Sequence, residues 1–97
     1  MLVYKGINIF PEQFRTVLSM FDELSGRFKL RIKKEDNNLV SKIVIVCEKA
    51  MASNPDIYQL EKQIKIKIKE ALSINPEVII VNGFNIEGNK LKIIDYI

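Results

Sequence analysis

The sequence has no histidine and a single cysteine, Cys47, among its 97 residues. Without histidine, Ser-His-Asp triads, Cys-His pairs and histidine metal sites are excluded. One cysteine cannot form an internal disulfide or a thiolate metal cluster, so we expect a reducing cytoplasm as the location. A GxGxxG pattern and a phosphate loop ending in GKS or GKT are also missing. The sequence therefore predicts no metal site and no nucleotide-binding loop of these kinds.

Long apolar runs and a strong charge bias are missing too. No apolar run approaches the length that crosses a membrane, and the N-terminus MLVYKGINIF lacks the features of a signal peptide. The net charge of +3 is mild for a nucleic-acid-binding protein. Tyr4, Tyr58 and Tyr96 are scattered and form no stacking platform beside a basic strand. We therefore expect neither a membrane nor a nucleic acid as a partner, and one small domain over residues 1–97.

Two segments predict helices. In residues 10–24, Pro11 and Glu12 suit a first helical turn, an apolar stripe follows, and Ser25-Gly26 would end the helix. The stripe comprises Phe14, Val17, Leu18 and Phe21. In residues 55–73 the stretch QIKIKIKE alternates like a strand, but the longer window has a helical stripe. That stripe comprises Ile57, Leu60, Ile64, Ile68, Ala71 and Leu72. Ile66 lies outside this stripe. Because the helical stripe extends over the longer window, we predict a helix over residues 55–73.

Short apolar or alternating segments predict the strands, over residues 2–5, 27–34, 39–49, 77–82 and 89–97. In the second of these, Phe28, Leu30 and Ile32 would face inward, and Lys29, Arg31 and Lys33 would face water. The order of elements is β-α-β-β-α-β with one extra C-terminal strand. It matches an α+β fold of the ferredoxin-like type, an antiparallel sheet with two helices on one face.

Two predicted strands are apolar on both faces, over residues 43–47 and 78–81. Helices on one face would leave the second face of these strands uncovered. The extra strand with its loop, a second copy of the chain or another domain could cover it. The pattern predicts a homodimer or a tightly bound partner.

Residues 5–18, KGINIFPEQFRTVL, resemble the start of the C-terminal domain of phenylacetate-coenzyme A ligases, which coenzyme F390 synthetase-like proteins share. The family stretch is roughly RGVNVFPxQIExVL. The matching residues are Gly6, Asn8, Phe10, Pro11, Gln13, Val17 and Leu18. Near the end of the chain, FNIEGNKLKIID is similar to the family's PRSEGKAKRVID.

This resemblance implies an adenylate-forming ligase, which activates a carboxylate with ATP and Mg²⁺ and passes the acyl group to coenzyme A. The family's large N-terminal domain supplies the ATP phosphate loop and the acyl pocket, so this chain would need that domain in cis or in trans. The small domain would be a mobile lid and inactive alone. The resemblance places Lys5, Gly6 and Asn8 close to the hinge between the two domains.

The family lysine that reaches the substrate carboxylate and the α-phosphate has a displaced counterpart here. Aligning the shared Glu-Gly puts Asn89 at the lysine position and Lys90 one residue later. Lys90 is therefore the candidate catalytic residue, with a solvated turn lysine as the alternative. We expect Cys47 to be a buried inert thiol, and Lys62, Lys65 and Lys69 to form a solvated helix face. The alternative function is a stand-alone ferredoxin-like domain for small-molecule sensing or dimerisation.

Overall fold

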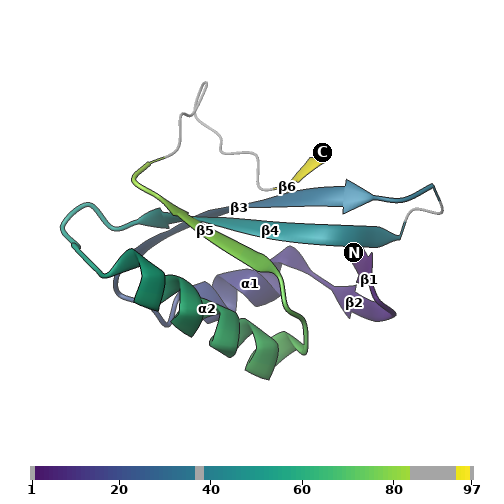
Figure 1. The fold of residues 1–97 in the computed structure, drawn as a ribbon, viewed down its shortest axis with the longest axis horizontal. Coiled ribbons are helices and arrows are strands. Elements are labelled where there is room, and N and C mark those ends of the chain that lie inside the picture. The colour runs from purple at the N-terminus through teal and green to yellow at the C-terminus, as the bar shows by residue number, and fades with distance from the viewer. Residues whose placement is uncertain (1, 37–38, 84–93, 97) are drawn as a thin grey trace.

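The computed structural model describes residues 2–36, 39–83 and 94–96, which form two helices and a six-stranded sheet (Figure 1). The elements are β1 (Leu2–Tyr4), β2 (Ile7–Ile9), α1 (Pro11–Leu18), β3 (Leu24–Lys34), β4 (Val40–Lys49), α2 (Ile57–Leu72), β5 (Glu77–Val81) and β6 (Ile94–Tyr96). Both helices lie on the same face of the sheet (Figure 1). The predicted α+β class, the helical layer and the C-terminal strand are confirmed.

The sheet is mixed, whereas the sequence led us to expect an antiparallel one. β4 runs antiparallel to β3 but parallel to both β1 and β5, and β6 runs parallel to β3. β4, α2 and β5 form a β-α-β crossover, and a strand that returns through a helix runs parallel to the one it left. β1 and β5 share one edge of β4, with β1 at Val40 and β5 along residues 44–48.

α1 is shorter than predicted. It starts at Pro11 as expected but ends at Leu18, and β3 begins at Leu24, within the predicted helix. Beyond the helix, the N–H groups of Met20 and Phe21 donate to carbonyls three residues back, which tightens the chain into turns. Phe21 still packs against the core from this turn. The helical spacing of apolar residues therefore continues beyond the end of the helix.

α2 is a helix, as the longer apolar period predicted, and not a strand. The Asp56 carboxylate caps its start by accepting the Gln59 N–H at 3.2 Å, and Ser73 ends it with a left-handed φ of 60°. Ile64 is fully buried, whereas Ile66 is 56% exposed. Of the predicted stripe, Leu60, Ile64 and Ile68 are buried in the middle of the helix, whereas Ile57 and Ala71 are exposed like Ile66.

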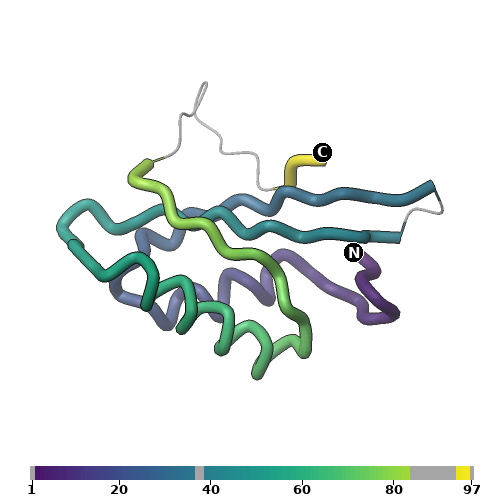
Figure 2. The backbone as a smooth tube through the Cα atoms, viewed as in Figure 1, coloured from purple at the N-terminus to yellow at the C-terminus, as the bar shows by residue number. Residues whose placement is uncertain are grey.

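The core lies between the sheet and the two helices, which run beneath it along the chain path in Figure 2. Alternate residues of β3 and β4 enter this core, and the intervening residues face away from the helices. The core residues of these two strands are Leu24, Phe28, Leu30, Ile32, Val40, Ile43, Ile45 and Cys47. Val44 is also buried, but it is not part of this core. In the part of the chain that the structure describes, no helix is both long and apolar enough to span a membrane.

Candidate functional site

The hairpin formed by β1 and β2, which we call the N-terminal hairpin, carries in its turn two of the three residues that the resemblance places near a hinge. Lys5 and Gly6 have φ angles of 49° and 79°, and two successive left-handed residues are typical of tight two-residue hairpin turns. The Lys5 ammonium lies 5.4 Å from the centre of the Tyr4 ring. The sequence suggested a turn and no strand between residue 5 and the first helix, so β2 was missed.

The third residue that the resemblance places near a hinge, Asn8, lies on β2 opposite Val3 and is exposed. Gln13, and not Asn8, orders the entrance to α1. The Gln13 side-chain oxygen accepts the Phe10 N–H at 2.8 Å, and the Gln13 N–H donates to the Phe10 carbonyl at 3.0 Å. This reciprocal pair fixes the backbone of Phe10, whose side chain is 47% exposed. The family-like sequence FPEQ thus builds a rigid junction between β2 and α1.

The candidate catalytic residue Lys90 and its neighbour Asn89 lie outside the described residues, so their roles stay predictions. Gly88 and Lys92 lie outside them as well. The described part of the last strand, β6, pairs with β3 at Leu30, Arg31 and Ile32. This pairing places the end of the chain at the edge of the sheet opposite β5.

The sheet face turned away from the helices, which we call the outer face, combines a basic strand with an apolar centre. Lys29, Arg31 and Lys33 alternate with the buried residues of β3, as the sequence predicted. Val46 and Val81 are half-buried and Ile79 is 40% exposed. The apolar centre of the outer face, which also includes Val44, comes from β4 and β5, the two strands predicted to be apolar on both sides.

Three ion pairs between described residues lie on the outer face. Lys29 lies 3.4 Å from Asp95, Lys42 lies 3.4 Å from Glu77, and Arg27 lies 3.7 Å from Glu48. Val44, whose register partners are Arg31 and Glu77, is only 6% exposed although it is not part of the core between sheet and helices. Surface pairs of this kind contribute at most about 1 kcal/mol each. Their main effect is to place charges around an apolar patch.

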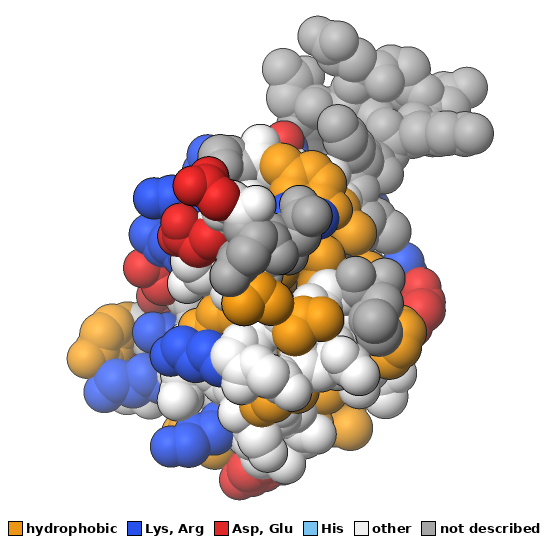
Figure 3. All heavy atoms as spheres, turned by 90° about the vertical axis from the view of Figure 1, so that its right-hand side faces the viewer, with side chains coloured by type: hydrophobic (Ala, Val, Ile, Leu, Met, Phe, Trp, Pro, Cys, Tyr) orange, Lys and Arg blue, Asp and Glu red, His pale blue; other side chains and the backbone are white. Residues whose placement is uncertain are grey.

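Figure 3 shows the end of the molecule that lies at the right in Figure 1, where the N-terminal hairpin and the end of β3 are found. Hydrophobic side chains gather in the middle of this end, and basic and acidic side chains together surround them, most of them along one side. The end is therefore amphipathic and not uniformly basic.

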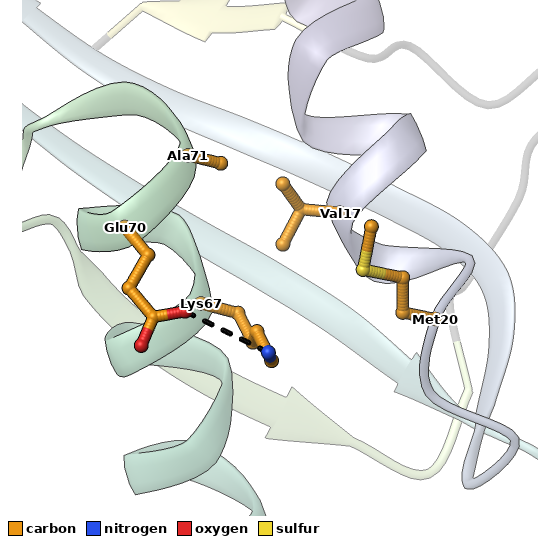
Figure 4. A pocket seen from close by; sticks show the side chains of 5 residues that line it. All are labelled: Val17, Met20, Lys67, Glu70 and Ala71. Carbon is orange, nitrogen blue, oxygen red and sulfur yellow. Dashed lines mark ion pairs between the residues drawn. The ribbon is translucent and has the colours of Figure 1, made fainter.

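A groove of about 210 Å³ lies between α1 and α2 on the other side of the sheet (Figure 4). Val17 and Ala71 face each other across it, and Met20 lies at one end. Lys67 and Glu70 form an ion pair of 3.6 Å at its rim. The two charged residues of the lining are thus paired with each other, and the other three lining residues are apolar.

Cys47 is fully buried, as predicted, and burial raises the pKa of its thiol from 9.0 to about 12, with a smaller contribution from the Glu61 carboxylate. Such a thiol is neutral and unreactive at neutral pH. Lys62, Lys65 and Lys69 are exposed on α2, also as predicted. Among the described residues, no group of three or more Cys, Asp or Glu side chains could hold a metal ion.

Sequence reasoning missed the capping role of Gln13 and the cross-strand arrangement of the outer-face charges. A capping residue at N3 normally follows a Ser or Thr at the N-cap, and here the N-cap is Phe10. The second omission has a different cause, because partners across a sheet depend on strand register, which sequence spacing alone does not reveal.

Comparison with known proteins gives a consistent assignment. Residues 6–96 match the family model described as AMP-binding enzyme C-terminal domain. The phenylacetate-coenzyme A ligase of Escherichia coli (strain K12) is 26% identical over 100 residues, which cover 98% of this chain. The chain spans only 23% of the length of that ligase.

Solved structures show the same fold. A domain of phenylacetate-coenzyme A ligase from Bacteroides vulgatus ATCC 8482 superposes with a TM-score of 0.81 at 21% identity, covering 99% of this chain and 91% of that domain. A 2-hydroxyisobutyryl-CoA ligase in the postadenylation state, in complex with 2-HIB-AMP, has a TM-score of 0.77 at 15% identity and covers 97% of this chain and 21% of its own. The same ligase in complex with 2-HIB-AMP and CoA, in the thioesterification state, has a TM-score of 0.73 at 15% identity, with coverages of 95% and 20%. The chain therefore belongs to the AMP-binding enzyme C-terminal domain family, and within it is phenylacetate-coenzyme A ligase-like.

Proposed function

We propose that this chain acts as the mobile C-terminal lid of a phenylacetate-coenzyme A ligase-like enzyme, together with a large ATP-binding domain joined in cis or supplied in trans. The observation that supports this most strongly is the family match over residues 6–96, nearly the whole chain. The chain corresponds to about a fifth to a quarter of complete ligases, with 23% and 21% of two relatives covered. In such a complex the lid would contribute side chains to the active site, and the large domain would hold most of the substrate.

ATP, Mg²⁺ and coenzyme A are the ligands that this proposal assigns to the complete enzyme. The related 2-hydroxyisobutyryl-CoA ligase has been solved with an acyl-adenylate and with CoA, which supports the assignment by analogy. In this chain, the N-terminal hairpin with Lys5, Gly6 and Asn8 would lie next to the hinge. Gln13 would then act as a positioning residue, because its reciprocal bonds with Phe10 fix the hairpin relative to α1.

Lys90 is proposed to supply the cation of the adenylation step. Negative charge must be held on the carboxylate and α-phosphate oxygens during in-line attack, and a long flexible ammonium group suits that role. Asn89, at the aligned family position, could donate only a neutral hydrogen bond, which is weaker than a charge-assisted one. The displacement by one residue would be absorbed if Lys90 lies in a loop.

The test is a pair of single-turnover assays on the complete enzyme, with the large domain present. Lys90→Ala should slow acyl-adenylate formation by about 100-fold, the loss typical of one group that stabilises developing charge, and should spare acyl transfer to coenzyme A. Lys92→Ala, a matched loss of a nearby lysine, should change neither rate by more than about twofold. Equal adenylation rates in wild type and Lys90→Ala would contradict the catalytic role.

The chain alone should catalyse no ATP-pyrophosphate exchange with aryl acids. Robust exchange by the purified chain would contradict the lid proposal as a whole.

A stand-alone sensing or dimerisation domain is the second candidate, and the apolar centre of the outer face favours it. Val44, Val46, Ile79 and Val81 form a patch that a second copy of the chain could cover. Light scattering distinguishes the two candidates. A homodimer that has no affinity for a large ligase domain would favour the alternative, and a monomer that binds such a domain would favour the lid.

A further inference from the structure

The side of α2 that points away from the sheet combines lysines with exposed apolar side chains, and we call it the lysine face. Leu60, Ile64 and Ile68 bury the opposite side of the helix in the core. The members of the lysine face, which are all exposed, are Tyr58, Lys62, Lys65, Ile66 and Lys69. None of them packs against the core. One side of α2 therefore stabilises the fold, and the lysine face does not contribute to it.

The charge of the lysine face has one sign. Among the described residues, its three lysines have no ion-pair partner. The two carboxylates of α2 lie elsewhere. Glu70 pairs with Lys67 at 3.6 Å beside the groove between the helices, and Glu61 is half-buried on the side of Cys47. Lysines three and four residues apart repel each other along a helix, so helix stability does not explain this arrangement.

Two large apolar side chains lie among these lysines. Tyr58 is 63% exposed and Ile66 is 56% exposed. Lys62 lies one helical turn from each, and its ammonium group is 4.4 Å from the centre of the Tyr58 ring. Tyrosine and isoleucine are weaker helix formers than lysine or alanine, so helix propensity does not explain them either. Exposed aromatic and aliphatic side chains surrounded by charge are typical of protein–protein interfaces.

We propose that the lysine face binds an acidic amphipathic helix of a partner protein. Lys62 and Lys69 lie two helical turns apart, about 10 Å along the axis of α2. Carboxylates spaced three, four and seven residues apart on a partner helix repeat over the same distance. An apolar residue between those carboxylates contacts Ile66, because packed helices interdigitate through residues spaced three and four apart. The surface does not depend on the chain acting as a ligase lid.

The composition of the lysine face favours a protein partner over a membrane or an RNA. A helix that lies on an anionic membrane buries a whole apolar face in the lipid, whereas the apolar face of α2 is buried in the core. The lysine face has no arginine, and Tyr58 is its only aromatic residue. Single-stranded RNA is bound mainly by several aromatic or arginine side chains that stack on its bases.

The test is an NMR chemical-shift titration of the 97-residue chain with two synthetic peptides of identical composition. One peptide places glutamates and leucines along a single face of a helix, and the other is a scrambled sequence that distributes them around the helix. The first peptide should shift the amide signals of residues 57–72 with saturation, and the scrambled peptide should bind at least about tenfold more weakly. Added salt should weaken binding of the first peptide, because exposed charges are screened.

Two variants of the lysine face and one control separate charge from apolar contact. Ile66→Ala should weaken binding by about fivefold or more, the loss typical of an apolar interface residue, and its exposed position keeps the fold intact. A triple lysine variant should weaken binding by at least about tenfold. A control that removes the same charge from the outer face should stay within about twofold of wild type. The triple variant is Lys62→Gln, Lys65→Gln and Lys69→Gln, and the control is Arg31→Gln, Lys33→Gln and Lys42→Gln.

Four results would overturn the proposal. They are an absence of saturable shifts in residues 57–72, equal binding of the two peptides, an equal loss in the triple variant and its control, and wild-type affinity in Ile66→Ala. Tighter binding of a single-stranded RNA, or of vesicles of phosphatidylserine and phosphatidylcholine, than of the amphipathic peptide would also overturn it, because the lysine face would then bind another class of partner.

Discussion

Gly6→Ala should destabilise the fold through backbone conformation alone. Gly6 has a φ of 79°, and a Cβ atom built at this position would meet no atom within 4 Å. The substitution therefore causes no steric clash with the rest of the protein. The remaining cost is that of holding an L-residue in the left-handed region, about 1–2 kcal/mol. For a domain of this size, each kcal/mol lowers the melting temperature by about 4–8 °C, so we expect a decrease of at least about 4 °C.

Two further variants, compared with Gly6→Ala by thermal and urea denaturation, test whether backbone conformation causes the loss of stability. Lys5→Asn should raise the unfolding free energy by about 0.5 kcal/mol, because asparagine tolerates the left-handed conformation that Lys5 adopts at 49°. Gly83→Ala is the control, since Gly83 lies outside the left-handed region and its nearest contact would be an ordinary 3.8 Å. It should leave stability unchanged or slightly higher. Equal losses in Gly6→Ala and Gly83→Ala would refute the argument.

Two further predictions concern the core. The folded protein keeps the Cys47 proton up to a pKa of about 12, whereas the unfolded chain loses it near 9.0. The unfolding free energy of wild type should therefore fall, relative to Cys47→Ala, by about 1.4 kcal/mol per pH unit between these values. Urea titrations at several pH values measure this difference, and parallel pH profiles would contradict it. Ile64→Ala should cost about 2–5 kcal/mol because Ile64 is fully buried, whereas Ile66→Ala, at a side chain 56% exposed, should cost less than about 0.5 kcal/mol. Similar losses in urea denaturation would contradict the assignment of the helix faces.

The periodic parts of the fold could be predicted from the sequence because burial follows periodicity there. In α2 a helical stripe outweighed a local alternation, and the exposure of Ile66 shows why, since a strand would have buried Ile64 and Ile66 together. In β3 the alternation predicted which residues face the core. Both results depend on a single buried face for each element, which a one-dimensional pattern can encode.

The turns and the strand pairing could not be predicted in the same way. Gly6 signalled a turn, but Lys5 adopts a left-handed conformation that lysine does not favour, so the sequence did not reveal the two-residue turn of a hairpin. At the end of α1, Phe21 retains its core contact after the helix has stopped, which hid the boundary. The parallel pairing of β4 and β5 is a property of the crossover through α2. None of these features has a local periodicity.

The features of the candidate site could also be predicted from the sequence only in part. The sequence FPEQ identified the junction at Phe10 through family resemblance, but the hydrogen bonds of Gln13 required coordinates. Lys29, Arg31 and Lys33 were recognised as solvent-facing, whereas the opposition of Lys33 and Lys42 emerged only from the register.

The N-terminal hairpin is joined to the rest of the sheet by one register pair, Tyr4 with Val40, whereas β5 is joined to β4 along five residues. Its position therefore depends on the side chains of Leu2, Tyr4 and Ile9, which are buried in the core. Segments with few backbone bonds to their neighbours can open locally without global unfolding. Amide hydrogen exchange in the hairpin accordingly reports the strength of this side-chain packing, and exchange in β3 and β4 reports the stability of the whole domain.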